Sequence, residues 1–444
     1  MVILISLSSV GPFVVTTFAA DIAANVSQTS KSTNNPITID AGNYNLDLTG
    51  KSDTSVRFQK MVDSLPSGST INLPKGTYKF TSAVKLKNGM KLIASNNNVK
   101  IKGIGTNTLF WTGNDNTFQD IEFQNCSTAI SVLYKKGLSV ISCGFINNIK
   151  YSGINIYGSS DCSVKYSYFY NIHKYGVLID KDSSSITVDN NSFDNPKVFG
   201  GYAKEQIGGH VYCMNGTKVN VTNNVIKNSG GQGIIFGYNS TTDKGTTNSV
   251  AKNNKCTGNG QEGITVYGGS KKITSGNSVI GNTCKNNRFN QIEVWQANNN
   301  VVRGNTVEES ASNSGNLGAI CLFSVVKTTC SENKVLSSQN NGIDITAGSY
   351  NCTVTGNNIA NTNGRNNTEV AEKGNAILLD SDGISQPQFI TINNNKISSS
   401  KGIIDKSGIY STSNSDNHNE IDTNTITGYK VGFHSYAKMT CGVN

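Results

Sequence analysis

Proline and closely spaced cysteines are scarce in this chain. Only 6 of its 444 residues are proline, whereas 45 are glycine. Together with abundant asparagine, serine and threonine, this favours many short strands joined by turns over long helices. The ten cysteines are scattered without a CxxC pair, which argues against zinc-binding spacings and places most thiols in the core. No flexible linker follows about residue 50, which indicates one elongated domain.

Long apolar runs are missing beyond residue 20, so no later segment reaches the roughly 18 apolar residues of a membrane span. Residues 1–20 are apolar and end in small residues, which predicts a signal peptide and a secreted, extracellular or cell-surface protein. Lysine and arginine number 38 against 29 acidic residues, and this excess favours an anionic partner. Because the basic residues are dispersed and no nucleic-acid-binding motif is present, a polysaccharide is a better candidate than nucleic acid.

A triplet of asparagine, any residue and an apolar residue recurs from residue 191 almost to the C-terminus. Its members begin at Asn191, Asn224, Asn254, Asn282, Asn305, Asn333, Asn357, Asn395 and Asn424. Strands of the Gly-Ile type follow the triplets after a turn, as in 263-GITVYG-268 and 291-QIEVWQ-296. Repeats with short strands and turns of variable length are typical of coils that stack on one continuous core. The sequence therefore predicts an all-β, single-stranded right-handed parallel β-helix, a solenoid.

The repeat also predicts contacts between neighbouring coils. The asparagines are expected to form a ladder at one turn, in which each amide bonds to the coils above and below. Cys256 and Cys284 follow consecutive ladder asparagines at the same inward position. They are expected to be neighbours in the core, either as stacked thiols or as a disulfide.

The N-terminal part predicts a cap for the β-helix. In 53-DTSVRFQKMVDSLPSGSTINLPKGTYKF-80, the apolar side of a short helix that starts near Asp53 is formed by Val56, Phe58, Met61, Val62 and Leu65. A capping helix followed by a Leu-Pro-x-Gly-x-Tyr turn resembles the start of the pectate-lyase-like superfamily, which includes secreted polysaccharide-active enzymes and phage tail spikes. The expected parts are a signal peptide at 1–20, an N-terminal extension at 21–50, the capping helix and first strand at 51–82, the β-helix at 83–436 and a tail at 437–444.

Strand alternation predicts two columns of side chains on the outer face of the Gly-Ile strands. In 291-QIEVWQ-296, Ile292 and Val294 point inward, so Glu293 and Trp295 point outward. The same register places Tyr267 and Phe323 beside Trp295, in an aromatic strip suited to stacking on sugar rings. The longest insertions are expected to wall a groove over these columns: 194–208, 239–248, 360–375 and 380–388.

Carboxylates in this groove predict cleavage of a polysaccharide by glycoside hydrolysis. Glu293 and Asp344 lie two coils apart in the first column, so their carboxyls are expected roughly 9–10 Å apart, close to the acid and base of an inverting enzyme. The two residues are therefore the candidate catalytic pair. The residues expected to bind substrate are Tyr267, Trp295, Phe323, Tyr212, Asp180, Lys181, His210, Arg288 and Asp380.

Other functions remain open at this stage. A lyase or C5-epimerase acting on a uronate polymer needs a proton donor, such as Tyr212 or Tyr267, and cations near the sugar carboxylate. The basic residues on or next to the groove strands are Lys181, Lys204, His210 and Arg288. The local signatures of pectate lyases, mannuronan C5-epimerases and polygalacturonases are absent. A non-catalytic adhesin or phage-like receptor-binding protein would need only the aromatic strip.

The sequence calls for no particular cofactor. Its four histidines are too dispersed in the repeat to form an evident metal site. A Ca²⁺ site on the acidic turn 180-DKDSSS-185 is left open, although such turns commonly hydrogen-bond their own backbone.

Overall fold

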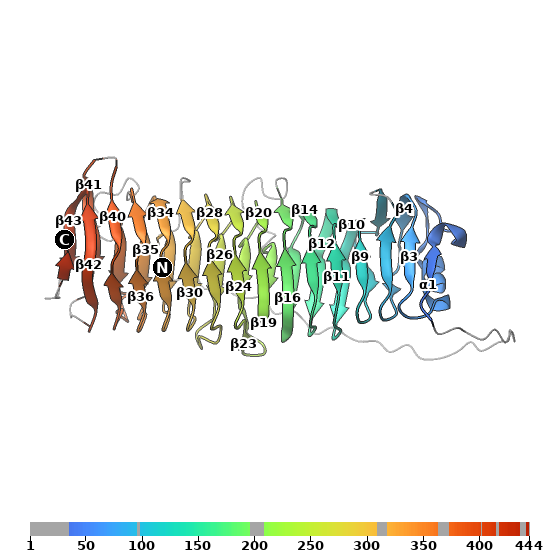
Figure 1. The fold of residues 1–444 in the computed structure, drawn as a ribbon, viewed down its shortest axis with the longest axis horizontal. Helices are drawn as coiled ribbons and strands as arrows, with labels where there is room; N and C mark the ends of the chain where they lie inside the picture. Colours follow the sequence, from blue (N-terminus) through green and yellow to red (C-terminus); the bar gives the residue numbers. More distant parts are fainter. Residues whose placement is uncertain are drawn as a thin grey trace. The chain divides into compact units, whose positions relative to one another are not determined.

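Each coil of the solenoid contains three short strands, and each strand pairs in parallel with its equivalent in the next coil. The computed structural model describes residues 35–95, 98–195, 208–308, 318–362, 373–400, 402–413, 417–435 and 441–443, the last of these by backbone alone. The predicted signal peptide lies outside these residues. A representative coil runs through β28 (Thr283–Lys285), β29 (Ile292–Trp295) and β30 (Val301–Arg303). Figure 1 shows such coils following one another from α1 to β43.

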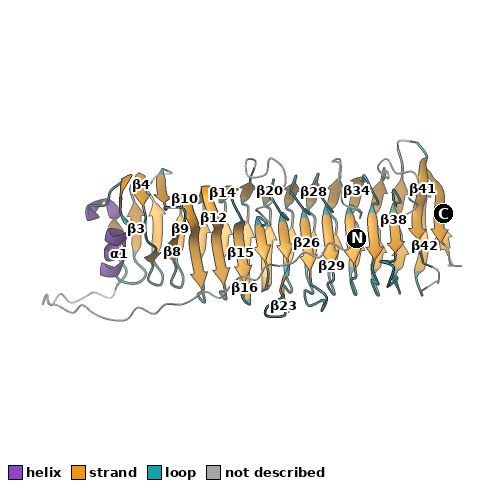
Figure 2. Ribbon diagram, turned by 180° about the vertical axis from the view of Figure 1, so that it is seen from behind, coloured by secondary structure: helices purple, strands orange, loops and turns teal. Residues whose placement is uncertain are grey.

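The stacked strands form three sheets that run along the solenoid, and Figure 2 shows the stack from the side opposite to Figure 1. The Gly-Ile sheet contains β5 (Val84–Lys85), β8 (Thr108–Trp111), the ends of β10 (Ile121–Leu133) and β12 (Gly144–Tyr157), β15 (Tyr175–Asp180), β18 (Val211–Cys213), β21 (Ile234–Phe236), β26 (Ile264–Tyr267), β29, β32 (Ile320–Phe323), β35 (Ile343–Thr346), β38 (Ile377–Asp380), β41 (Ile404–Ser411) and β43 (Tyr429–Ser435).

The triplet sheet begins each coil after the ladder asparagine. It contains β2 (Thr49–Asp53), β4 (Gly76–Lys79), β7 (Val99–Lys102), the first parts of β10 and β12, β14 (Tyr168–Ile172), β17 (Ser192–Asp194), β20 (Val225–Lys227), β25 (Lys255–Thr257), β28, β31 (Thr306–Glu308), β34 (Lys334–Ser337), β37 (Asn358–Ala360), β40 (Lys396–Ser398) and the end of β42 (Glu420–Thr427).

The third sheet precedes the ladder asparagines. It contains β1 (Thr38–Asp40), β3 (Thr70–Leu73), β6 (Lys91–Ala94), β9 (Thr117–Gln119), β11 (Ser139–Ile141), β13 (Ser163–Lys165), β16 (Ser183–Asp189), β19 (Gly216–Thr222), β24 (Val250–Lys252), β27 (Ser278–Ile280), β30, β33 (Thr329–Ser331), β36 (Thr353–Thr355), β39 (Thr391–Asn393), the start of β42, and β44 (Cys441–Val443). A separate hairpin joins β22 (Tyr238–Asn239) to β23 (Lys244–Gly245).

The predicted asparagine ladder is confirmed over its whole length. At every step from Asn191 to Asn424, the backbone N–H of one ladder asparagine donates to Oδ1 of the next at 2.8–3.0 Å. Each of these asparagines is buried. The ladder continues one coil further, because the backbone N–H of Ser167 donates to Oδ1 of Asn191 at 2.9 Å. Burying an amide in this way is tolerated because its donors and acceptors are satisfied by neighbouring coils.

The core consists of inward side chains stacked from coil to coil. Phe145, Phe169 and Phe193 form a parallel stack with ring centroids 4.5 and 4.4 Å apart. Cys256 and Cys284 pair in register as predicted, and both are free thiols. The nine cysteines whose side chains the structure describes are all buried and free, as expected of small core residues.

The N-terminal cap is a short helix, α1 (Ser55–Ser64), which follows a 3-10 turn at Ala41–Tyr44. Phe58, Met61, Val62 and Leu65 are buried as predicted, but Val56 is 57% exposed and does not belong to the apolar side. Parallel pairing starts at β1 and reaches β44, so the solenoid extends beyond the expected boundaries at 83 and 436. Among the described residues, neither helix is long and apolar enough to cross a membrane.

Candidate functional site

The two predicted columns have the predicted register. Glu293 pairs with Thr265 on one side and with Cys321 on the other, and Cys321 in turn pairs with Asp344. Trp295 lies between Tyr267 and Phe323 in the second column. Strand alternation therefore placed these side chains on the correct face and in the correct coils, with Ile292 and Val294 fully buried behind them.

The first column is not exposed, contrary to the expectation of an open surface. Glu293 is 8% exposed and Asp344 is 0% exposed, whereas Tyr267, Trp295 and Phe323 remain partly exposed. One cause is the position of the backbone just before β32, which lies close to the neighbouring strand β35. A Cβ added to Gly318, two residues before β32, would lie 3.2 Å from Cγ of Asp344 and 3.1 Å from its backbone nitrogen. The backbone at Gly318 thus lies directly against Asp344.

The site contains a third carboxylate, Glu262, which lies two residues before the start of β26. It is 8% exposed, and its Oε2 accepts a hydrogen bond of 3.5 Å from Oγ1 of Thr265. A hydrogen bond from the side chain of Gln232 also reaches this carboxylate. Sequence reasoning missed Glu262 because alternation was applied only within the strand. The sequence signal that could have identified Glu262 is an acidic residue immediately before the Gly-Ile pair of its strand. Gln232 and Asn290 occupy the same position in the neighbouring coils.

The protonation of Glu262 and Glu293 is controlled by burial. Burial raises the pKa of Glu293 well above its usual value of 4.5, and the charge on Glu262 raises it further. Burial also raises the pKa of Glu262, but hydrogen bonds from Gln232 and Thr265 act in the opposite direction. Glu262 is therefore the more easily ionised member of the pair, and Glu293 the better proton donor.

The buried thiol of Cys321 lies among the three carboxyl groups. Burial raises its pKa, and the charges of Glu293, Asp344 and Glu262 raise it further, in that order. The strand register places Cys321 between Glu293 and Asp344. A neutral thiol, rather than a nucleophilic thiolate, therefore occupies the middle of the site.

The aromatic strip consists of two pairs of rings. Trp295 and Phe323 are stacked with centroids 3.6 Å apart and an interplanar angle of 9°. Tyr267 contacts Tyr238 of the β22–β23 hairpin edge to face, with centroids 5.3 Å apart. One face of Trp295 is thus covered by Phe323 and Tyr267 lies in the next coil on the other side, so a ligand would contact the part of the indole ring that remains exposed. The strip was expected to stack on sugar rings, but Trp295 and Phe323, which are in register, stack on each other along the solenoid.

Two other residues predicted to bind substrate, His210 and Tyr212, have rings that contact other parts of the solenoid. His210 is 1% exposed, its Nε2–H donates to the carbonyl of Lys227 at 2.8 Å, and burial lowers its pKa to about 4. It is therefore a neutral core residue, and we remove it from the predicted substrate-binding set. Tyr212 is partly exposed and packs on Tyr175 with ring centroids 4.8 Å apart. Burial raises the pKa of Tyr212 to about 12, so its phenol stays protonated at neutral pH.

The remaining predicted residues are dispersed around the Gly-Ile sheet. Asp180 accepts hydrogen bonds from the backbone of Lys181 and from Asn239, and Asp380 accepts one from Thr412 at 2.8 Å. Arg288 is half-buried over the ring of Phe289. Lys204 lies outside the described residues. Within the described part of the chain, no group of three or more His, Cys, Asp or Glu side chains is arranged to hold a metal ion.

Comparisons with known proteins agree with this fold. The model of the family described as "Right handed beta helix region" matches residues 82–244 and 243–426. No curated protein sequence matches the chain.

Among solved structures, bacteriophage phi29 gene product 12 in its pre-mature form has a TM-score of 0.65 at 11% identity, over 90% of this chain and 57% of that one. PfbA, a surface adhesin of Streptococcus pneumoniae, has a TM-score of 0.58 at 14% identity, and the match covers 80% of this chain and 99% of PfbA. The catalytic unit of an α-1,3-glucanase from Streptomyces thermodiastaticus has a TM-score of 0.53 at 14% identity, and the match covers 94% of this chain and 72% of the glucanase chain. These identities establish likeness of fold alone, and with the family match covering most of the sequence, the chain belongs to the right-handed β-helix family.

Proposed function

We propose that this protein binds a polysaccharide against the outer face of the Gly-Ile sheet and hydrolyses it, with Glu293 as the general acid. The observation that carries the proposal is a pair of almost buried carboxyl groups, Glu262 and Glu293, on the same face as a partly exposed aromatic strip. Buried carboxyl groups with raised pKa values are typical of acid and base catalysts. Aromatic rings beside them are typical of sugar-binding sites.

The environments of the two glutamates suggest their roles. Glu293 is held protonated by burial and by the charge of its neighbour, so it can protonate the leaving glycosidic oxygen. Glu262 receives hydrogen bonds from Gln232 and Thr265, which favour its ionised form. An ionised carboxylate beside a protonated one is the arrangement that glycoside hydrolysis requires.

The identity of the second carboxylate predicts the stereochemistry of the product. Glu262 lies in the coil next to that of Glu293, and its charge acts on Glu293, which favours a closely spaced pair such as the carboxyl groups of retaining enzymes, about 5–5.5 Å apart. Asp344, the partner expected from the sequence, lies two coils from Glu293, a spacing that would fit an inverting enzyme. We favour Glu262 because it is the carboxylate whose charge acts on Glu293 and because backbone lies directly against Asp344.

Structural neighbours support a carbohydrate role without selecting among functions. One similar structure is the catalytic unit of a glucanase, and another is a surface adhesin. The adhesin alternative is favoured by the aromatic strip, which can bind a glycan without any carboxylate.

An assay of a polysaccharide panel separates these functions. New reducing ends without ultraviolet absorbance of an unsaturated uronate support hydrolysis, and the absorbance would indicate a lyase. Retention on a polymer gel without either signal would indicate an adhesin.

Replacing Trp295 by alanine should weaken binding of the polysaccharide by roughly 1–3 kcal/mol, because the partly exposed apolar area of the indole ring is lost. A smaller cost of about 1 kcal/mol in stability is expected as well, since Phe323 loses its stacking partner. Affinity gel electrophoresis measures the first effect and urea unfolding the second. Tyr166→Ala is the matched control, because Tyr166 is 60% exposed in a turn after the third sheet. Equal retention of both variants would exclude Trp295 from the binding surface.

A further inference from the structure

A pocket lies beside the Gly-Ile sheet, where the chain turns toward the third sheet. The connection after β26 spans residues 268–277 and the one after β38 spans residues 381–390. Between them, the connections after β29, β32 and β35 are shorter, at residues 296–300, 324–328 and 347–352. Two longer loops therefore stand on either side of three short turns, and the space between them is a pocket of about 530 Å³. This volume is within the range of roughly 300–1,000 Å³ typical of small-molecule sites.

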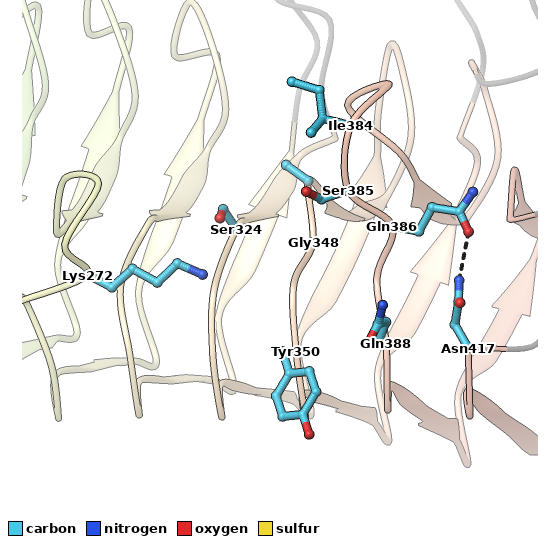
Figure 3. Close-up of a pocket in the computed structure, with 10 residues that line it drawn as sticks. Lys272, Ser324, Gly348, Tyr350, Ile384, Ser385, Gln386, Gln388 and Asn417 are labelled. Carbon is cyan, nitrogen blue, oxygen red and sulfur yellow. Dashed lines mark hydrogen bonds between the residues drawn. The ribbon is translucent and has the colours of Figure 1, made fainter.

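The floor of this Lys272 pocket is made of small residues, and its walls combine polar side chains with Tyr350 and Ile384. Ser324, Ala347 and Gly348 form the floor, and Ser385 and Gln386 belong to the loop after β38. Figure 3 shows Lys272 extending from its own loop toward Ser324, and Gln386 bonded to Asn417 on the far side. Ser324 directly follows Phe323, so the pocket begins where the aromatic strip ends. A bound glycan on the strip could thus place a substituent or a neighbouring sugar in the pocket.

The pocket contains one cationic group that is not neutralised by a described carboxylate. Lys272 takes part in none of the ion pairs formed by the described residues. Its neighbour Lys271 is paired instead with Asp243. Asp382, on the opposite loop, directs Oδ1 to the backbone N–H groups of Ile384 and Ser385, at 2.9 and 2.6 Å. Lys272 is a half-buried residue, so the attraction of its ammonium group for an anion is less screened than at an open surface.

The charge of this pocket is opposite to that of the carboxyl cluster. The ionised Glu262 would repel an acidic sugar at the position of cleavage, whereas Lys272 and its hydroxyl and amide neighbours would attract one. We propose that the Lys272 pocket binds an acidic sugar residue of the glycan, and that the residue at the carboxyl cluster is neutral. The substrate class is then an anionic heteropolysaccharide. This inference rests on the proposed function for the position of cleavage, but the binding of an acidic sugar can be tested separately.

The test compares two ligands and four proteins, the wild type and three variants. Glucuronate-containing oligosaccharides and their carboxyl-reduced counterparts are titrated into the wild type, Lys272→Met and Lys271→Met by calorimetry. The wild type should prefer the carboxylate form about tenfold, and Lys272→Met should lose that preference, because one charge-assisted contact disappears. Lys271→Met removes the same charge from the same loop and should keep the preference. Ser385→Tyr, which fills the pocket from an exposed position, should weaken binding of the carboxylate form as Lys272→Met does.

The outcomes distinguish this inference from the proposed function. A preference that depends on Lys272 supports the inference even if no polymer is cleaved. Equal binding of both ligand forms by the wild type, no binding of either, or equal losses in Lys271→Met and Lys272→Met would overturn it. Hydrolysis of a neutral polymer would remain possible in each of these cases, because the carboxyl cluster lies outside the pocket.

Discussion

Replacement of Glu293 by glutamine should lower polysaccharide turnover by a factor of about 100 or more while leaving binding largely unchanged. Glutamine preserves the shape of the side chain but cannot donate the proton that the leaving oxygen requires, and general acid catalysis contributes roughly 10²–10⁴ in rate. Turnover is measured as reducing ends released per enzyme, and binding by retention on a polymer gel. Glu308→Gln is the control, since Glu308 pairs with Lys285 on the triplet sheet. Wild-type turnover in Glu293→Gln would remove the catalytic role of this residue.

The same variant should also change how stability depends on pH. The folded-state pKa of Glu293 lies above its usual value of 4.5, so the unfolded chain releases this proton at lower pH than the folded protein does. The contribution of Glu293 to stability is therefore fully present below about pH 4.5 and is lost as the pH rises toward the folded-state pKa. In Glu293→Gln this loss should be reduced, so urea midpoints of the two proteins should diverge as pH increases, with the variant more stable at neutral pH. This gain also excludes misfolding as the reason for lost turnover.

Replacement of Asn282 by leucine should destabilise the protein by roughly 2–4 kcal/mol, because several buried polar groups lose their partners at once. Oδ1 of Asn282 accepts from the backbone N–H and the Nδ2 group of Asn254, at 2.8 and 3.0 Å. Its Nδ2 group donates to the carbonyl of Ala251 and to Oδ1 of Asn305, at 2.9 and 3.0 Å. Leucine supplies none of these bonds in a turn that excludes water. Urea unfolding measures the loss.

A matched variant separates this effect from the addition of an apolar residue. Lys255→Leu places leucine on the exposed outer face of the neighbouring coil and should change stability by no more than about 0.5 kcal/mol. Hydrogen exchange in Asn282→Leu should accelerate first at the backbone N–H of Asn254, which loses its acceptor. Stability equal to that of Lys255→Leu would mean that the ladder contributes little to the solenoid.

The repeat made the register predictable, because one asparagine position and a two-residue side-chain period determine which residues stack. Cys256 and Cys284 are neighbours for this reason, as are Trp295 and Phe323. Exposure was less predictable. Whether an outward residue meets solvent depends on backbone from the neighbouring coil, and Gly318 beside Asp344 has no signature in the strand itself.

Residues outside the strand pattern were the hardest to assign. Glu262 precedes its strand, so alternation did not place it with Glu293. His210 occupies the position that glycine holds in the coils of Gly233 and Gly263, and a ring there fills the core and bonds to a main-chain carbonyl. Sequence reasoning treated its basic side chain as a groove residue. The Lys272 pocket exists because two of the connections beside it are longer than those between them. Long connections were predicted to border the binding surface, but their length did not indicate that Lys272 would give the pocket its positive charge.

The anomeric configuration of the first product, followed by proton NMR as the wild-type protein cleaves its polysaccharide, tests the assignment of Glu262 and Glu293 most directly. A retained configuration is predicted, because the two carboxyl groups belong to adjacent coils and one can form a covalent intermediate while the other transfers protons. An inverted configuration would contradict this pair and favour Glu293 with Asp344. Failure to release new reducing ends from any polymer that the protein binds would contradict hydrolysis itself.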